Sequence, residues 1–378
     1  MHKQLSIMFV CISLLGAITA RAEDGITKNR IVIGQNITLQ GGKNDYGAAV
    51  AAGMEVYFSG INIRGGINGR QIVLKTLDDD NKPDKAEANA RQLVEKDKAF
   101  LLFGSIEGGP STAVMKVANE LKVPFFGPLA GAPTLRRPHQ PLVFPVRADH
   151  RDEFRALLVQ AKSLGMAKVA FLRSDSETGL QHLANVKLIC EELGLKLVVD
   201  MPFKSDIKEQ QLDTYAQQIQ KSGAQMVFNH GGIGVYEALI RKVRAENKVT
   251  AIYAVNSGSF QLAKKLGPLA QGMIFAQVVP SPWERKTAIT REYQDEFARL
   301  KPGQEFSYGS LEGYITAKAL VLALRQAGPV LTRTGFVASL NNTSLELNGL
   351  KSVYSPGNHQ GLAFVDLSIV NGDGKFRH

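Results

Sequence analysis

The order of apolar segments from Arg30 onward constrains the fold of this 378-residue chain more than any other feature. Continuous apolar runs, typical of strands buried on both faces, alternate with segments of helical spacing. This order is typical of a parallel sheet covered by helices. The alternation pauses at the short extended segment 144–147 and begins again at 151–164. At roughly 100–200 residues per domain, the chain predicts an α/β protein of two lobes, each with a mainly parallel sheet flanked by helices.

Three crossings between the lobes are expected, at 144–147, at 272–283 and in the tail 349–377. The tail predicts a hairpin, because Asn371-Gly372 and Asp373-Gly374 are turn signals. The predicted lobes are 23–146 with 282–342, and 147–281 with 343–378 including the hinge hairpin. Predicted strands are 31–37, 71–77, 100–103, 123–129, 168–174, 196–203, 225–229 and 250–255. Predicted helices are 46–58, 83–98, 151–164, 179–193, 208–222, 235–246, 260–266, 287–300, 310–327 and 332–340, with one more ending at 122.

The N-terminus has the pattern of a secretory signal peptide. Lys3 precedes the apolar run 5–18, and Ala20-Arg21-Ala22 provides a small-residue cleavage site. The apolar run is shorter than the roughly 20 residues of a spanning helix. We therefore expect residues 1–22 to be cleaved near Ala22 and the mature protein to be exported to the periplasm without an anchor.

Charge and cysteine content narrow the possible partners. The formal net charge is +10, but the basic residues are scattered and no basic stretch is interleaved with aromatic residues. Nucleic acid is therefore not an expected partner of this exported chain. Of the two cysteines, Cys11 leaves with the signal peptide. Cys190 then has no intrachain partner, and its apolar helical setting predicts a small buried side chain.

A candidate ligand cleft begins at the segment 100–113. An apolar strand turns at Gly104, and Gly108-Gly109-Pro110 opens a helix whose first N–H groups point out of the carboxyl end of the strand. Open parallel sheets bind small ligands at this edge. An ordinary strand-to-helix turn made of small residues is the alternative interpretation. Further loops expected at the same edges of the two sheets are 130–133, 175–179, 230–234 and 256–259.

Motifs for catalysis or metal binding are not found. The sequence contains no Gly-x-Ser-x-Gly, no His-Glu-x-x-His and no phosphate loop ending in Gly-Lys-Ser/Thr. The run Asp78-Asp79-Asp80 could bind a metal, but it directly precedes a helix that opens at Pro83, where carboxylates satisfy N–H groups. The seven histidines are widely spaced along the chain. We therefore expect no enzyme activity, no cofactor and no metal site.

Several short segments, in this order and spacing, carry a family resemblance over nearly the whole mature chain. The sequence resembles the periplasmic solute-binding proteins of ABC transporters, in the leucine/isoleucine/valine-binding group with the type I two-lobed fold. The resemblance implies a solute held between two lobes joined by three hinge strands. The matching segments are Ile31-Val-Ile-Gly-Gln-Asn36, Ile67-Asn-Gly-Arg70, Leu77-Asp-Asp-Asp80, Phe126-Gly-Pro128, Leu311-Glu-Gly-Tyr-Ile315 and Tyr354-Ser-Pro-Gly-Asn-His-Gln-Gly361.

The resemblance also implies which residues contact the solute. They belong to a helix start and to loops of both lobes, namely Tyr46, Ile106, Glu107, Gly108, Gly109, Ala130, Gly131, Thr178, Ile233 and Asn256.

Four of these positions depart from the pattern of branched-chain amino-acid binders. Gly108 and Gly131 stand where Ser and Thr hydroxyls hold the ligand carboxylate, and Thr178 replaces a tyrosine. Asn256 stands where a glutamate meets the ammonium group. An unpaired ammonium in a closed cleft would cost about 1–3 kcal/mol or more. Glu107 could supply the missing charge, or its loop could merely expose it to solvent. We expect a small polar or carboxylate-bearing solute, such as an amino-acid-like molecule, an organic acid or an amide.

The expected function is capture of that solute by a monomer and delivery to an ABC transporter permease. One alternative is a ligand-sensing module of a membrane receptor system, which would use the same two lobes. A periplasmic hydrolase is a further alternative, which the missing nucleophile motif disfavours.

Overall fold

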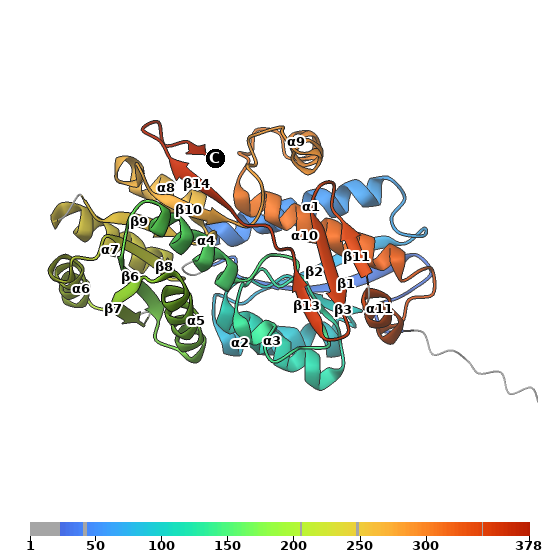
Figure 1. The fold of residues 1–378 in the computed structure, drawn as a ribbon. Coiled ribbons are helices and arrows are strands. Elements are labelled where there is room, and N and C mark those ends of the chain that lie inside the picture. Colours follow the sequence, from blue (N-terminus) through green and yellow to red (C-terminus); the bar gives the residue numbers. More distant parts are fainter. Residues whose placement is uncertain (1–22, 41–43, 205, 247–248, 342) are drawn as a thin grey trace, which may run out of the picture.

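Two sheets, each covered by helices on both faces, form the two lobes of the protein (Figure 1). The computed structural model describes residues 23–378 except 41–43, 205, 247–248 and 342. The predicted signal peptide 1–22 lies outside the described residues. Within them, the expected α/β class with mainly parallel sheets is confirmed.

The first sheet has five parallel strands in the order β2-β1-β3-β4-β5. Ile31 and Ile33 of β1 pack into the same apolar cluster as helices α1 and α10, whereas Val32 between them packs with α2 and α3. The period of two along the strand thus buries both faces of the sheet. The strands are β1 (Arg30–Ile37), β2 (Gln71–Asp78), β3 (Leu101–Phe103), β4 (Phe125–Phe126) and β5 (Val143–Phe144). The helices are α1 (Asn44–Ile63), α2 (Pro83–Arg91), α3 (Gly108–Leu121) and α10 (Tyr308–Gln326).

The second sheet has seven strands in the order β15-β14-β10-β9-β8-β6-β7, of which β6 to β10 are parallel. Helices α4 and α5 cover one face, and α6, α7 and α8 cover the other. The strands are β6 (Lys168–Ser174), β7 (Lys196–Phe203), β8 (Met226–His230), β9 (Ala251–Ala254), β10 (Ile274–Gln277), β14 (Asp366–Val370) and β15 (Phe376–Arg377). The helices are α4 (His150–Ser163), α5 (Glu177–Leu193), α6 (Glu209–Ser222), α7 (Ile233–Glu246) and α8 (Ser259–Leu266).

Among the residues that the structure describes, the remaining helical elements are three short turns and the two helices α9 and α11. The helix expected over 83–98 ends at Arg91 and continues as a π-helical turn, η2 (Gln92–Lys96). None of the described helices combines the length and the apolar character that a membrane span needs. The other elements are the 3₁₀ turns η3 (Pro133–Leu135) and η4 (Gly267–Ala270), and the helices α9 (Ala288–Leu300) and α11 (Arg333–Leu340).

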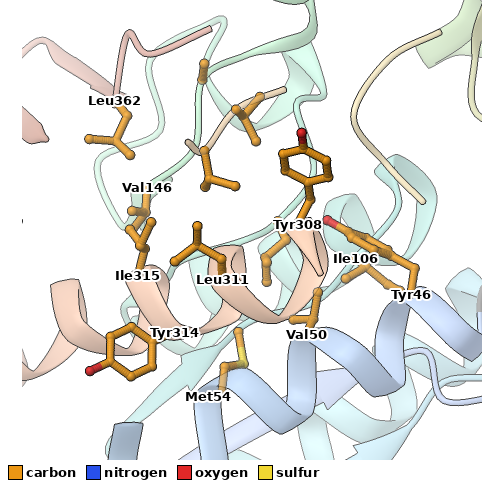
Figure 2. Close-up of a cluster of buried hydrophobic side chains, with 14 of the residues drawn as sticks. Tyr46, Val50, Met54, Ile106, Val146, Tyr308, Leu311, Tyr314, Ile315 and Leu362 are labelled. Atoms are coloured by element: carbon orange, nitrogen blue, oxygen red, sulfur yellow. The ribbon is translucent and has the colours of Figure 1, made fainter. Parts of the chain in front are cut away.

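Helices α1 and α10 pack at unusually short range. A Cβ on Gly53 would lie 1.8 Å from the carbonyl oxygen of Ser310, and one on Gly313 would lie 2.1 Å from that of Val50. Glycine at these positions therefore lets the two backbones touch. Figure 2 shows the buried side chains along this seam, where Met54 of α1 lies opposite the apolar face of α10.

The C-terminal segment differs from the prediction. Residues 343–361 form a separate antiparallel sheet of β11 (Thr343–Glu346), β12 (Lys351–Ser355) and β13 (Asn358–Gly361). This sheet contacts the first lobe, because the Tyr354 hydroxyl donates to Pro145 O at 2.9 Å. Placing all of 343–378 in the second lobe is therefore wrong for 343–361. The hairpin turn predicted at 371–374 is present between β14 and β15. The other predicted boundaries stay predictions.

The chain passes between the lobes three times, between β5 and α4, between β10 and α9, and between β13 and β14. In both sheets, the loops that follow the carboxyl ends of the parallel strands face this junction, so loops of both lobes meet there. Figure 1 shows the green and yellow second lobe beside the blue, teal and orange elements of the first.

Candidate functional site

Loops from both lobes enclose a small pocket at the junction. Its volume is about 10 Å³, close to the roughly 10–15 Å³ that one water molecule needs. The lobes are thus closed on each other, and a solute larger than water enters only when they separate or side chains move. The first lobe contributes Glu107, Gly108, Leu129 and Ala130 to the lining, and the second contributes His150, His230, Gly231 and Ser257.

The predicted strand, loop and helix at 100–113 form the first-lobe side of the pocket. Strand β3 ends at Phe103 and α3 begins at Gly108. Between them, Ser105 and Glu107 adopt left-handed backbone conformations, with φ of 76° and 67°. Such conformations are uncommon for residues other than glycine. The carbonyl oxygen of Ser105 accepts a hydrogen bond from Leu129 N at 2.8 Å, which fixes this loop to the next pocket-lining loop.

The adjacent glycines Gly108 and Gly109 point in different directions. A Cβ on Gly108 would lie 3.3 Å from the Cγ2 of Thr178 in the second lobe. A Cβ on Gly109 would instead lie 3.2 Å from the ring of Pro83 in α2. The structure therefore directs Gly108 across the junction, and directs the side-chain position of Gly109 away from it. Thr178, half-buried in the first turn of α5, lies on the opposite side of the junction.

The position of Gly131 has no room for a side chain, because the backbone at the start of α4 approaches it. Its carbonyl oxygen accepts a hydrogen bond from His150 N at 3.0 Å. A Cβ on Gly131 would lie 2.6 Å from that same nitrogen. A serine or threonine at Gly131 would therefore push the start of α4 away, and this departure from the amino-acid binders has a packing cause. Ala130 remains in the pocket lining.

Tyr46, Ile106 and Ile233 occupy buried positions around the junction. A Cβ on Gly258 would lie 2.0 Å from Ile233 Cδ1 and 3.9 Å from Tyr46 Cβ, so α1 of the first lobe meets the start of α7 and the loop before α8 there. Ile106 packs beside Gly47 of α1, inside the first-lobe core shown in Figure 2. The side chain of Ile106 thus supports the site by packing.

A buried ionic network connects the two lobes next to the pocket. The Arg147 guanidinium forms an ion pair with Glu153 of α4, and its Nε lies 3.8 Å from Oε1 of Glu312 in α10. Oε2 of Glu312 accepts hydrogen bonds from the Tyr46 hydroxyl and from Asn256 Nδ2, both at 2.8 Å. Asn256 N donates to Glu153 Oε2, also at 2.8 Å. First-lobe helices, the hinge and the second-lobe loop at Asn256 are therefore joined by one network.

Charge and burial oppose each other in this network. Burial raises the pKa of Glu153 and of Glu312 above the ordinary range, although Arg147 acts in the opposite direction. Burial alone would lower the pKa of Arg147, but the carboxylates of Glu153 and Glu312 raise it. One guanidinium faces two carboxyl groups. Arg147 is therefore the cation that favours the ionised form of Glu153 and of Glu312 against the effect of burial.

The predicted contact set includes Tyr46 and Asn256 but not the charged residues that organise them. Arg147 is the last residue of the extended segment 144–147, and Glu312 is the single carboxylate of the mostly buried helix α10. A single carboxylate within such a mainly apolar helix is a signal that could have identified Glu312 from the sequence, because buried charges need partners. Glu153, His150 and His230 carry no comparable signal.

The acidic run at 78–80 has a structural role. Asp79 is fully buried and accepts hydrogen bonds from Asn36 Nδ2 and the Thr38 hydroxyl, both at 2.6 Å. Asp78 accepts from the backbone N–H groups of Leu39 and Asp80 at 2.9 Å. These carboxylates close the loops that precede α1 and α2.

Comparison with known proteins identifies the family. The family model described as periplasmic binding protein matches residues 30–375, which is almost the whole described chain. This chain belongs to that family. Among curated relatives, the Leu/Ile/Val-binding protein homolog 2 of Brucella abortus is 22% identical over 324 residues, covering 82% of this chain and 85% of the relative.

Solved structures share the two-lobed type I fold of this periplasmic binding protein. A possible leucine/isoleucine/valine-binding protein from Rhodopirellula baltica superposes with a TM-score of 0.85 at 21% identity, covering 95% of this chain and 98% of that one. A solute-binding protein of an ABC transporter from R. palustris, solved in complex with benzoate, has a TM-score of 0.80 at 20% identity, with 92% and 95% coverage. The family resemblance and the fold predicted from the sequence are thus confirmed. Family and fold are those of periplasmic solute-binding proteins rather than of enzymes.

Proposed function

We propose that this periplasmic binding protein captures a small carboxylate-bearing solute between its lobes and delivers it to the permease of an ABC transporter. The observation that carries the proposal is the pocket lined by loops of both lobes. A solute that contacts both sets of loops stabilises the closed form, which is how hinge closure around a ligand is driven.

The carboxylate preference rests on the groups around the pocket. The first turn of α3 starts at Gly108, and the N–H groups of a first helical turn favour an anion. The imidazole of His230 lines the opposite side, where a ring nitrogen that carries a proton can donate to a carboxylate. The related fold from R. palustris, solved with benzoate, supports a carboxylate as a ligand type that such lobes accommodate.

Glu107 is the group that we expect to decide whether an amino group is also recognised. Asn256 uses its backbone N–H and one N–H of Nδ2 on Glu153 and Glu312, and its Oδ1 carries no charge, so Asn256 supplies no anion to an ammonium group. The Glu107 carboxylate lies in the pocket lining itself. An amino group on the solute would therefore be recognised by Glu107, because a carboxylate accepts hydrogen bonds from an ammonium group.

A thermal-shift screen with matched ligands tests the binding proposal. The mature protein, residues 23–378, is tested against leucine, 4-methylpentanoate and leucinamide, and against phenylalanine, 3-phenylpropanoate, phenylalaninamide and benzoate. A ligand at 100 times its Kd adds about 2.7 kcal/mol, a rise in Tm of roughly 5–10 °C for lobes of this size. We expect shifts only from compounds with a free carboxylate, and a shift from an amide alone would contradict the proposal.

The same screen assigns the amino-group role with a Glu107→Gln variant. If the amino acids bind better than the matched acids, Glu107→Gln should remove that preference while affinity for the acids stays unchanged. An amino-acid preference that survives in the variant would show that another carboxylate, such as Glu312, meets the ammonium group.

Delivery to a permease requires a separate experiment. Tagged mature protein loaded with the solute found in the screen is used to capture membrane proteins of its own host, with solute-free protein as the control. Recovery of a permease supports the proposal, whereas recovery of a sensor kinase in its place would favour the receptor alternative. Sedimentation of the same preparation tests the proposed monomer.

A further inference from the structure

Three histidines far apart in the sequence come together beside the pocket. His150 is the first residue of α4, His182 lies in α5, and His230 is the last residue of β8. One ligand atom from each lies within 4.8 Å of the others. The ring centroids of His182 and His230 are 3.8 Å apart, and those of His150 and His230 are 5.0 Å apart. Their sequence spacing gave no indication of this cluster, because the fold of the second lobe creates it.

His182 is the member of the cluster that calls for a ligand. Its side chain is fully buried, and neither ring nitrogen has a hydrogen-bond partner among the residues that the structure describes. Buried polar atoms of folded proteins are otherwise nearly always paired, since an unpaired one keeps its desolvation cost. A metal ion bonded to a nitrogen of His182 would satisfy that need.

The surroundings of His150 match those of a metal-binding histidine. Nδ1 of His150 lies 2.8 Å from Oε1 of the buried Glu153. Metal-binding histidines commonly donate one ring N–H to a carboxylate, which fixes the ring and leaves the other nitrogen for the metal. The Nε2 atom of His150 is then the nitrogen for the metal, and Glu153 is its orienting partner.

We propose that His150, His182 and His230 bind one divalent late transition-metal ion, of which Zn²⁺ is the model case. Three imidazoles select Zn²⁺, Cu²⁺ or Ni²⁺ over Mg²⁺ and Ca²⁺, which prefer oxygen ligands. With Zn–N bonds of about 2.0–2.1 Å, the nitrogens of a tetrahedral site are about 3.3 Å apart. The rings therefore move closer by up to about 1.5 Å on binding, which side-chain rotation provides.

The fourth coordination position faces the pocket. His150 and His230 line it together with Glu107, so a carboxylate in the pocket, from Glu107 or from a solute, lies on the side of the fourth position. This arrangement of three protein nitrogens and one exchangeable oxygen ligand resembles open zinc sites. Separation of the lobes gives the metal its path in. The inference goes beyond solute transport and does not require that the proposed solute class is correct.

Metal binding is measured directly on the mature protein after removal of metals with a chelator. Zn²⁺ is titrated by calorimetry and by competition with a chromogenic zinc chelator, and Co²⁺ is titrated for its visible absorption, which reports coordination number. The variants are His182→Asn and His230→Asn. The matched control is His139→Asn, which removes a histidine that pairs with His359 outside the cluster. Circular dichroism and thermal unfolding verify that each variant folds.

We expect one equivalent of Zn²⁺ to bind to wild type and to His139→Asn. The Kd should rise at least about tenfold in both cluster variants, because loss of a direct ligand should cost no less than loss of an outer-shell partner. The Co²⁺ complex should show the intense absorption of a four-coordinate ion. Absence of stoichiometric Zn²⁺ binding to wild type would overturn the proposal, as would binding that is unchanged in folded His182→Asn. Because the Co²⁺ spectrum needs only wild-type protein, the proposal stays testable even if a variant fails to fold. Failure here leaves the solute screen unaffected, since no metal is added in that screen.

Discussion

Replacing Arg147 by methionine should destabilise the protein in a manner that depends on pH. The guanidinium pairs with Glu153 and Glu312 and donates to Ala148 O at 3.0 Å and Leu129 O at 3.2 Å. Methionine has a similar length and no charge. The variant therefore leaves two buried carboxyl groups without their cation, and it removes the Arg147 donor from two backbone carbonyls.

The expected cost is set by the uncompensated carboxylates. Removing one member of a buried ion pair typically costs about 3–5 kcal/mol, because the remaining charge stays desolvated. For a chain of this size that corresponds to a fall in Tm of at least about 6 °C, at roughly 2–4 °C per kcal/mol.

The sign of the pH dependence follows from the raised pKa values of Glu153 and Glu312. Both are above 4.5 in the folded protein, so the folded state binds more protons than the unfolded state in the window just above that value. Stability therefore falls as the pH rises through this window. Arg147→Met removes the cation that holds the pKa values of Glu153 and Glu312 down, so both values rise further in the folded variant. The pH range over which stability falls then extends upward, and the variant's loss of stability relative to wild type grows toward neutral pH.

Urea unfolding of wild type and Arg147→Met at about pH 5 and about pH 8 measures the effect. The deficit at the higher pH should exceed that at the lower by at least about 1.4 kcal/mol, the value of one pKa unit on one carboxyl group. The matched control is Arg136→Met, since Arg136 is also buried but donates to the carbonyls of Ala130 and Arg147. The lost hydrogen bonds predict a loss of roughly 1–3 kcal/mol. This loss should be the same at both pH values, because burial lowers the pKa of Arg136 only to about 10. Equal deficits for Arg147→Met at both pH values would refute this account of the network.

Two further predictions concern glycines. Gly108→Val places a side chain across the junction and should weaken binding of the solute found in the screen at least about tenfold. The side chain of Gly109→Val points toward α2, so this variant should change the Kd by less than about threefold. Calorimetry measures both Kd values, and the reverse order would exclude our assignment of the two directions. Gly313→Ala brings a methyl group to 2.1 Å from Val50 O and should cost about 2 kcal/mol or more, while Gly234→Ala, with open space at its Cβ, should stay within about 0.5 kcal/mol of wild type or gain stability. Equal urea midpoints for those two variants would contradict the close packing of α1 on α10.

Elements with strong local patterns were predicted closely. The strand predicted at 168–174 and the hairpin turn at 371–374 are found in the structure, because each depends on hydrophobic order or on turn residues near it in sequence. The antiparallel sheet of 343–361 was not predicted as a first-lobe element. Its alternating strand pattern identifies strands, but the partner surface at Pro145 lies some 200 positions away in the chain.

Some features of the candidate site were also predicted from the sequence, and others depend on tertiary packing. Glu107, Gly108 and Ala130 were expected at the junction and line the pocket, since strand-to-helix loops of parallel sheets share one edge. The orientation of Gly109 toward Pro83 could not be predicted, because it depends on how α3 packs on α2. The contact between Arg147 and Glu312 links the hinge to a helix late in the chain, and no local pattern reports such a contact.

The sequence by itself determined the two-lobed α/β class, the family, the loops at the junction and the small residues that shape them, since these depend on periodicity and on conformational preferences of neighbouring residues. The tertiary structure alone decided which charges are buried together and that His150, His182 and His230 meet. Such clusters arise from contacts between elements that are distant in the chain, and their chemistry depends on burial, which only the packed lobes create.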